Sequence, residues 1–357
     1  MTRDYSQFFP KAAQTPATAN PLLALGWHPH FASQIESGDL DARPPIRVTE
    51  VQRSGLTVAG DGIETTLPPR PDATVGDWLL LDPERPGDSQ LLERRSLLRR
   101  RAPGTGRQVQ LIAANIDTLF VVTSCNADFN VARLERYIAL AFEAEIDPVI
   151  LLTKADLAED ADRYAAEAGV ISERVPVVTL DARGTDPDTR LAPWTKPGRT
   201  VAFLGSSGVG KSTLTNALLG RATLATQGIR EDDAKGRHTT TARQLHRIPG
   251  RGCVLDTPGM RELRLTDVAD GIGNLFADLV TLAAECRFRD CAHESEPGCA
   301  VRAAIAEGTL DAARLARWRK LQAEERFNAA SLAERRASDR DFTRMVRRVM
   351  KEKPNRR

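Results

Sequence analysis

A stretch of eight residues has the spacing by which proteins bind the phosphate chain of a nucleotide. Residues 205–212 read GSSGVGKS and fit the pattern G-x-x-x-x-G-K-[ST] at each defining position. Glycines let successive backbone N–H groups point at phosphates, and the helix that follows adds partial positive charge. In this pattern Lys211 reaches the β- and γ-phosphates, and the Ser212 hydroxyl ligates Mg²⁺. The predicted phosphate-site residues are Gly205, Ser206, Ser207, Gly208, Val209, Gly210, Lys211, Ser212 and Thr213.

A second motif selects the base. Thr153, Lys154 and Asp156 form the sequence T-K-x-D directly after an apolar run, as in the guanine-specificity pattern [NT]-K-x-D. An Asp carboxylate can accept hydrogen bonds from guanine N1–H and from the 2-amino group, and adenine offers neither donor in that arrangement. A helix beginning near Asp156 would also explain these four residues, but their place beside a phosphate loop favours GTP and GDP as ligands.

A third motif completes the predicted magnesium site. Residues 256–259 read DTPG, in which Asp256 would hold Mg²⁺ through water and the Gly259 amide would sense the γ-phosphate. Between the two phosphate motifs, residues 235–241 read KGRHTTT. A threonine of this segment would complete the Mg²⁺ shell, and we favour Thr240 over Thr239.

Hydrolysis itself needs a group that orients water. Met260 follows the DTPG motif, and a thioether orients water poorly. His238 is the nearest polar candidate in the switch segment, so we expect it to be catalytic beside Lys211. The expected intrinsic turnover is slow and depends on a partner that orders the switch segment.

Four potential metal ligands lie within fourteen residues near the C-terminus. Cys286, Cys291, His293 and Cys299 have the spacing C-x4-C-x-H-x5-C in a chain with only five cysteines and five histidines. Three thiolates and one imidazole make a closed tetrahedral Zn²⁺ site with no open position for chemistry. The pattern therefore predicts one structural zinc ion.

The elements that position these motifs alternate between strands and helices. Apolar runs end at or just before the base motif, the phosphate loop and the DTPG motif, and residues 131–145 have helical spacing. Strands alternating with helices predict a parallel sheet whose ligand lies at the carboxyl ends of the strands. The predicted strands of this region are 117–123, 148–152, 176–180, 200–204 and 252–256.

The order of the motifs is unusual because the base motif precedes the phosphate loop by about fifty residues. Ordinary GTPases have the reverse order, so the order predicts a circularly permuted GTPase domain. Short alternating runs between residues 42 and 105 predict a small β-barrel of the OB type, a fold that often binds oligonucleotides. A purely structural β-domain remains open, and so does the role of the arginine-rich run 94–107, as a solvated linker or an RNA contact.

Composition describes an ordinary globular protein. The 357 residues are 41% hydrophobic and 27% charged, with a net charge of +2, and the basic residues are enriched in the last fifty. No run of apolar residues is long enough to span a membrane, and the N-terminus lacks the apolar core of a signal peptide. We expect a cytoplasmic monomer with no membrane contact.

Together the motif order, the segment GRHTTT, the DTPG motif and the Cys/His spacing resemble the bacterial ribosome small-subunit-dependent GTPase A family. The similarity runs from about residue 42 to about residue 325. It implies GTP hydrolysis stimulated by the small ribosomal subunit, late in its maturation, with contacts to 16S rRNA. Residues 179–182, TLDA, depart from the family's usual Ser-Ala segment and leave their contact to guanine undecided.

The resemblance implies four regions: a partly disordered extension at 1–41, an OB-fold domain at 42–105, a circularly permuted GTPase domain at 106–275, and a zinc-binding, basic helical domain at 276–357. Two other functions are weighed against it. A P-loop ATPase or small-molecule kinase is disfavoured by Asp156, and a zinc-dependent RNA-binding scaffold would have only vestigial nucleotide binding.

Overall fold

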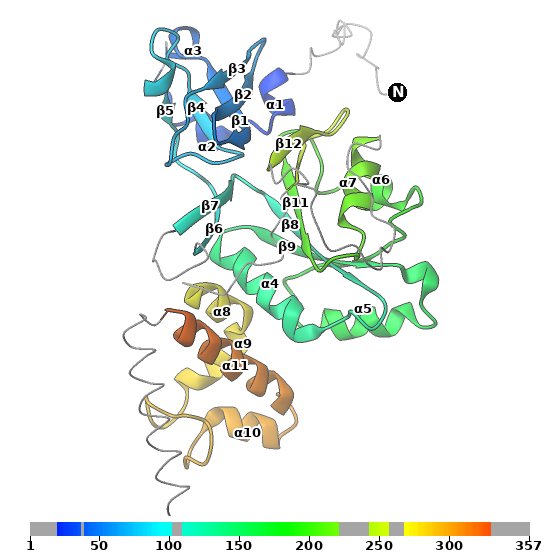
Figure 1. Cartoon of the computed structure of the whole chain (residues 1–357). Coiled ribbons are helices and arrows are strands. Elements are labelled where there is room, and N and C mark those ends of the chain that lie inside the picture. Colours follow the sequence, from blue (N-terminus) through cyan, green and yellow to red (C-terminus); the bar gives the residue numbers. More distant parts are fainter. Residues whose placement is uncertain (1–19, 37–38, 102–108, 221–242, 257–267, 330–357) are drawn as a thin grey trace, which may run out of the picture.

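The computed structural model describes residues 20–36, 39–101, 109–220, 243–256 and 268–329 (Figure 1). At its centre lies a sheet with the strand order β10-β9-β8-β11-β13-β12. Neighbouring strands are parallel except for β12, which pairs antiparallel with β13. The strands are β8 (Thr118–Ser124), β9 (Asp147–Thr153), β10 (Val177–Thr179), β11 (Thr200–Gly205), β12 (Gln244–Arg247) and β13 (Cys253–Asp256).

Helices cover both faces of this sheet, as its continuously apolar strands require. On one face α4 (Val131–Glu143) and α5 (Ala161–Gly169) share a core with Leu119 and Val121 of β8. On the other, α6 (Asp186–Arg190) and α7 (Lys211–Leu219) precede and follow β11 and pack on Phe120 and Phe203. The predicted strands and the helix at 131–145 are therefore present, with ends shifted by a few residues. The short η3 helix (Ala155–Leu157) follows β9.

A smaller group of strands precedes this sheet. The strand β1 pairs antiparallel with β2 and β4, while β2 also pairs with β3 and β4 with β5. One further pairing, Glu50 opposite Gln244, joins β1 to β12 and makes the two groups one continuous sheet. The elements are α1 (Pro21–Ala24), α2 (Pro29–Ala32), α3 (Asp39–Ala42), β1 (Pro45–Gln52), β2 (Gly55–Gly60), β3 (Glu64–Leu67), β4 (Trp78–Leu80), η2 (Pro86–Asp88) and β5 (Gln90–Leu91).

A fully buried arginine lies where these two groups meet. Arg47 of β1 donates hydrogen bonds to the carbonyl oxygens of Leu25, Gly76 and Asn115 and to the hydroxyl of Thr200. Burial lowers the pKa of its guanidinium. Because a buried cation must have its donors satisfied, Arg47 fixes the chain after α1, the loop before β4 and the start of β11 relative to one another.

Two strands form a separate ribbon between the groups. β6 (Leu97–Arg101) pairs antiparallel with β7 (Val109–Ala114). The two arginines before it are partly buried: Arg94 forms an ion pair with buried Asp77 at 2.7 Å, and Arg95 forms one with buried Asp117 at 2.6 Å. At these two positions the arginine run therefore serves internal ion pairs.

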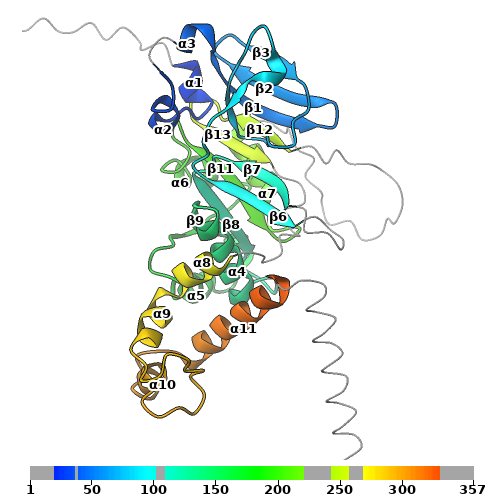
Figure 2. The ribbon, with the colours of Figure 1, turned by 90° about the vertical axis from the view of Figure 1, so that its left-hand side faces the viewer.

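Among the C-terminal helices, α8 (Ala269–Leu275) and α11 (Ala312–Ala329) contact α4, while α10 (Ala300–Ala306) lies away from it, next to α9 (Ala277–Ala284) (Figure 2). Arg317 of α11 forms an ion pair with Glu135 of α4 at 2.8 Å, and Arg136 of α4 with Glu324 of α11 at 2.5 Å. None of the helices within the described ranges is long and apolar enough to cross a membrane. The helices of the described range 268–329 are α8, α9, α10 and α11.

Candidate nucleotide site and metal cluster

The predicted phosphate loop connects β11 to α7. Gly208 and Gly210 have φ values of +76° and +99°, which L side chains rarely adopt. A Cβ at Gly205 would lie 2.2 Å from the Val122 carbonyl oxygen of β8, so the loop also needs glycine for close packing. Gly210 is the N-cap of α7, and the helix starts with free amide groups at the loop.

The Lys211 side chain folds back over this loop. Its Nζ donates to the carbonyl oxygen of Gly205 at 2.8 Å and to that of Ser206. Ser206 and Ser212 are half-buried, and Ser207 and Gly208 are exposed. The loop thus presents exposed backbone, a cation and a hydroxyl in one place, which is the set of groups that a Mg²⁺-bound phosphate chain requires.

Thr153 connects the base motif to the phosphate loop. It is fully buried at the end of β9, and its hydroxyl donates to the Val209 carbonyl oxygen at 2.7 Å. The same hydroxyl lies 3.2 Å from the Thr123 carbonyl oxygen at the end of β8. One side chain therefore links the ends of β8 and β9 to the phosphate loop. The sequence motif includes Thr153, but its hydrogen bond to the phosphate loop becomes visible only in the structure.

The other two residues of the base motif are open to a ligand. Lys154 adopts a left-handed backbone with φ +57° and is half-buried, and Asp156 is exposed in η3. Ala182, which sequence patterns left undecided, is buried, and its Cβ would lie 3.5 Å from a Cβ placed on Gly210. Segment 179–182 therefore reaches the same loop from β10.

Asp256 ends β13, which lies beside the strand of the phosphate loop and is separated from the strand of the base motif by β8 and β11. Burial raises the pKa of its carboxyl, while the positive charges of His246 and Lys211 oppose that rise. A partly buried carboxylate close to Lys211 suits a group that faces a hydrated Mg²⁺. The remaining predicted residues, His238, Thr239, Thr240 and Gly259, and also Met260, lie outside the described residues.

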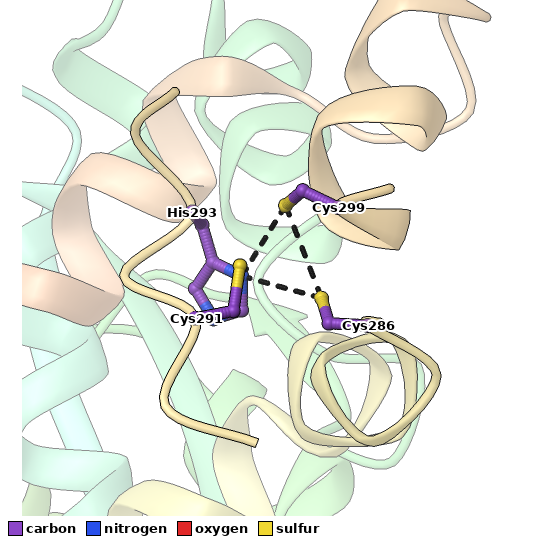
Figure 3. A group of neighbouring side chains, drawn as sticks. All are labelled: Cys286, Cys291, His293 and Cys299. Carbon is purple, nitrogen blue, oxygen red and sulfur yellow. Dashed lines mark hydrogen bonds between the residues drawn. The ribbon is translucent and has the colours of Figure 1, made fainter. Parts of the chain in front are cut away.

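The four predicted zinc ligands converge on one point (Figure 3). His293 Nδ1 lies 3.6 Å from Cys286 Sγ and 3.5 Å from Cys299 Sγ, and these two sulfurs are 3.9 Å apart. All four ligand atoms, including Cys291 Sγ, lie within 4.8 Å of one another. A tetrahedral zinc ion with three sulfur ligands and one nitrogen has ligand–ligand distances of about 3.5–3.8 Å. The cluster fits zinc both in donor type and in size.

The surroundings of the cluster hold its ligands in place. His293 has a left-handed backbone with φ +61°, and its ring lies 5.9 Å from that of Trp318 on α11. The Cys299 Sγ accepts from the Arg302 amide and caps the start of α10, which fixes the position of the sulfur. Glu296 accepts from the amides of Ala292, Glu294 and Ser295, and these bonds lower the pKa of Glu296 to about 2.

A cavity of about 330 Å³ lies among α8, α9 and α11. Its lining includes Ile272, Val280 and Trp318 and none of the nucleotide motifs. It is therefore not part of the predicted nucleotide site.

Comparison with known proteins agrees with this arrangement. A family model described as RsgA GTPase matches residues 91–266. The chain is 52% identical over 320 residues to the "Small ribosomal subunit biogenesis GTPase RsgA" of Mesorhizobium japonicum, which covers 87% of this chain and 92% of that protein. It is 46% identical over 343 residues to the "Small ribosomal subunit biogenesis GTPase RsgA 2" of Vibrio parahaemolyticus, which covers 95% and 96%.

Two solved structures share the fold. The crystal structure of YjeQ from Thermotoga maritima superimposes with a TM-score of 0.59 and 26% identity, covering 78% of this chain and 97% of that chain. The structure of YloQ, described as a circularly permuted GTPase, gives a TM-score of 0.56 at 23% identity, covering 81% and 97%. The likeness confirms the permuted GTPase fold that the motif order predicted.

Proposed function

The chain belongs to the RsgA GTPase family, and from this membership we propose that it hydrolyses GTP as a maturation factor of the small ribosomal subunit. The relatives carry that function in their names. The observation in this chain that supports it most directly is the Thr153 hydroxyl at 2.7 Å from the Val209 carbonyl oxygen. This contact brings a guanine-selecting motif to the edge of a phosphate loop, which suits GTP and disfavours ATP.

In the proposed complex, the phosphate chain lies along residues 205–213 and Asp156 accepts from the guanine edge. Ser212 and Thr240 would hold Mg²⁺, with Asp256 acting through water, and the ion would supply positive charge beside the phosphates. Lys211 leaves its two backbone carbonyl partners and contacts the β- and γ-phosphates. His238 orients the attacking water, the Gly259 amide responds to the γ-phosphate, and Thr239 is the alternative to Thr240 as the Mg²⁺ ligand.

The zinc ion has a structural role in this proposal. Cys286, Cys291, His293 and Cys299 hold it and leave no position open. It fixes the segment between α9 and α10, which has few buried residues of its own.

The strands β1–β5 are proposed to form an OB-type barrel that contacts 16S rRNA, and the chain is proposed to work as a cytoplasmic monomer. The domain division that goes with this proposal is an N-terminal extension to residue 41, the barrel at 42–105, the GTPase domain at 106–275 and the zinc domain from 276. The pairing of β1 with β2 and β4 supports the barrel, and the absence of a membrane-crossing helix among the described residues agrees with the location.

The decisive experiment measures GTP and ATP turnover with and without purified small ribosomal subunits. We expect slow GTP turnover, a rise of at least tenfold with subunits, and no ATP turnover. Lys211→Ala should abolish the activity, and His238→Ala should lose the stimulated part. Turnover of GTP that subunits leave unchanged would contradict the ribosomal role, and turnover that survives in Lys211→Ala would contradict the site.

A further inference from the structure

An exposed aromatic residue stands at the tip of the zinc loop. Phe288 lies between the ligands Cys286 and Cys291, and 41% of its surface is exposed. Its neighbours Arg287 and Arg289 are exposed as well. Single exposed apolar side chains are common on protein surfaces. Phe288 differs from them because an arginine stands on each side of it in sequence and because hydrogen bonds hold its loop.

The two flanking guanidinium groups are available to a ligand. The Arg287 guanidinium lies 5.4 Å from the centre of the Phe288 ring, a cation–π distance. Within the described part of the chain, neither Arg287 nor Arg289 forms an ion pair, although Asp290 is next in sequence and Glu285 and Glu294 are exposed nearby. The acidic neighbours disfavour binding by charge alone, and the ligand must therefore contact the ring as well.

The loop that carries Phe288 is held rigidly. The Arg287 amide donates to the Gly298 carbonyl oxygen at 3.1 Å, and the Cys291 amide donates to the Phe288 carbonyl oxygen at 3.3 Å. A Cβ on Gly298, whose φ is +76°, would lie 3.1 Å from the Arg287 Cβ. With its two ends at metal ligands, the tip loses little conformational freedom when it binds a partner.

We propose that Phe288, with Arg287 and Arg289 on either side, stacks on an unpaired base of single-stranded or bulged RNA. The ring supplies an aromatic face, and the arginines supply a stacking guanidinium and a contact to the adjoining phosphate. The proposal rests on the proposed ribosomal function for the presence of RNA. Phe288, Arg287 and Arg289 lie outside the nucleotide motifs, so their contact with RNA is separate from GTP hydrolysis.

The test uses the full-length, zinc-loaded protein and a fluorescently labelled twelve-nucleotide uridine RNA. Phe288→Ala should weaken binding about tenfold, because removing one stacking partner costs roughly that factor. Phe288→Trp should bind as the wild type does, and the fluorescence of its indole should be quenched by the RNA. Val280→Ala, which alters a residue of similar exposure on α9, is the matched control and should bind normally.

Phe288→Leu separates stacking from apolar packing on a protein. Leucine keeps an apolar side chain without an aromatic face, so it should bind RNA as weakly as the alanine variant. Equal RNA binding by wild type and Phe288→Ala, or normal binding by Phe288→Leu, would overturn the proposal. Zinc content and basal GTP turnover should be the same in all variants. Wild-type turnover that small subunits fail to stimulate would contradict the ribosomal role but leave the RNA result standing.

Discussion

The short side chain of Thr153 links the ends of β8 and β9 to the phosphate loop. It contacts carbonyl oxygens of β8 and of the phosphate loop, and both contacts are buried. In the base motif [NT]-K-x-D either amide or hydroxyl can donate at this position, since each carries a donor. Threonine in place of the more frequent asparagine therefore still supplies a donor for the hydrogen bond to the Val209 carbonyl oxygen.

Thr153→Val should show how much this bond contributes. Valine keeps the shape and leaves the Val209 carbonyl oxygen without its donor, which costs about 1–3 kcal/mol of unfolding free energy. Nucleotide affinity should fall as well, because the base motif is no longer tied to the loop. Urea denaturation and titration with a fluorescent GDP measure the two effects. Thr153→Ser keeps the hydroxyl and should retain affinity; equal losses in both variants would show that the methyl group matters instead.

Glu135 of α4 is a buried carboxylic acid, so its protonation state depends on the groups around it. Burial raises the pKa of its carboxyl above the ordinary 4.5, and Arg317 opposes part of the rise. At pH values between 4.5 and the raised pKa, the Glu135 carboxyl is protonated more often in the folded chain than in the unfolded chain. Stability from this group is therefore lost as the pH rises through that interval.

Glu135→Gln removes this titration. The unfolding free energy of the wild type minus that of Glu135→Gln should decrease as the pH rises from 4.5 and then become constant. Urea denaturation at half-unit pH steps provides the measurement. A difference that stays constant across the interval, or one that increases, would be inconsistent with a raised pKa.

At the scale of elements, α8 is the helix that passes from the GTPase sheet to the zinc region. Its Gly271 lies against α4, where a Cβ would come within 2.0 Å of the Ala139 carbonyl oxygen. The Gly271 amide donates to the Glu143 carboxylate at 2.9 Å. On the far side, Arg314 of α11 donates to the Leu275 carbonyl oxygen and pairs with Asp278 at 2.8 Å. α8 is thus fixed from two directions.

Two glycines of α8 provide a matched pair. Gly271→Ala should destabilise the protein by about 1–3 kcal/mol, because backbone atoms of α4 must move to admit the methyl group. Gly273→Ala, in the same helix with nothing within 4 Å, should be neutral or stabilise by up to about 1 kcal/mol. Thermal and urea denaturation compare them. If both substitutions had the same effect, the close approach of α8 to α4 would not be what fixes this helix.

The sequence predicted most elements of the central sheet, because their apolar runs are long and their motifs stand at fixed strand ends. It also predicted that the side chains of Cys286, Cys291, His293 and Cys299 converge, because their spacing in the chain is short. The partners of Arg47, the Arg94–Asp77 pair and the Arg317–Glu135 pair could not be predicted. Each joins residues distant in the chain, and an arginine's exposure depends on a fold that composition does not specify.

At the scale of the whole molecule, Arg47 joins the N-terminal helices, the small strand group and the GTPase sheet. Its partners Leu25, Asn115 and Thr200 belong to three separate segments of the chain. No carboxylate forms an ion pair with it among the described residues, so its donors are taken up by carbonyl oxygens and one hydroxyl, and the Trp78 ring lies 5.6 Å from the guanidinium. The position therefore accepts neither a smaller cation nor an apolar side chain without loss.

Arg47→Met should reduce the unfolding free energy by several kcal/mol, since it leaves the buried carbonyl oxygens of Leu25 and Asn115 without donors at about 1–3 kcal/mol each, while that of Gly76 keeps the Asn115 side-chain amide. Limited proteolysis should then cut between the small strand group and the GTPase sheet. Arg43→Met, at an exposed position two residues before β1, is the control and should resemble the wild type. Normal stability and protease resistance of Arg47→Met would contradict the role assigned to this side chain.

The pairing of β1 with β12 has a consequence for the order in which the chain can fold during synthesis. Glu50 and Gln244 are partners in one sheet but are about two hundred residues apart, which a ribosome needs roughly 10–40 s to translate. Until β12 leaves the ribosome, part of β1 exposes unpaired backbone groups at a strand edge, a known starting point for aggregation. Because β12 completes that edge, the nascent N-terminal strands acquire their last protection only when most of the GTPase sheet has been made.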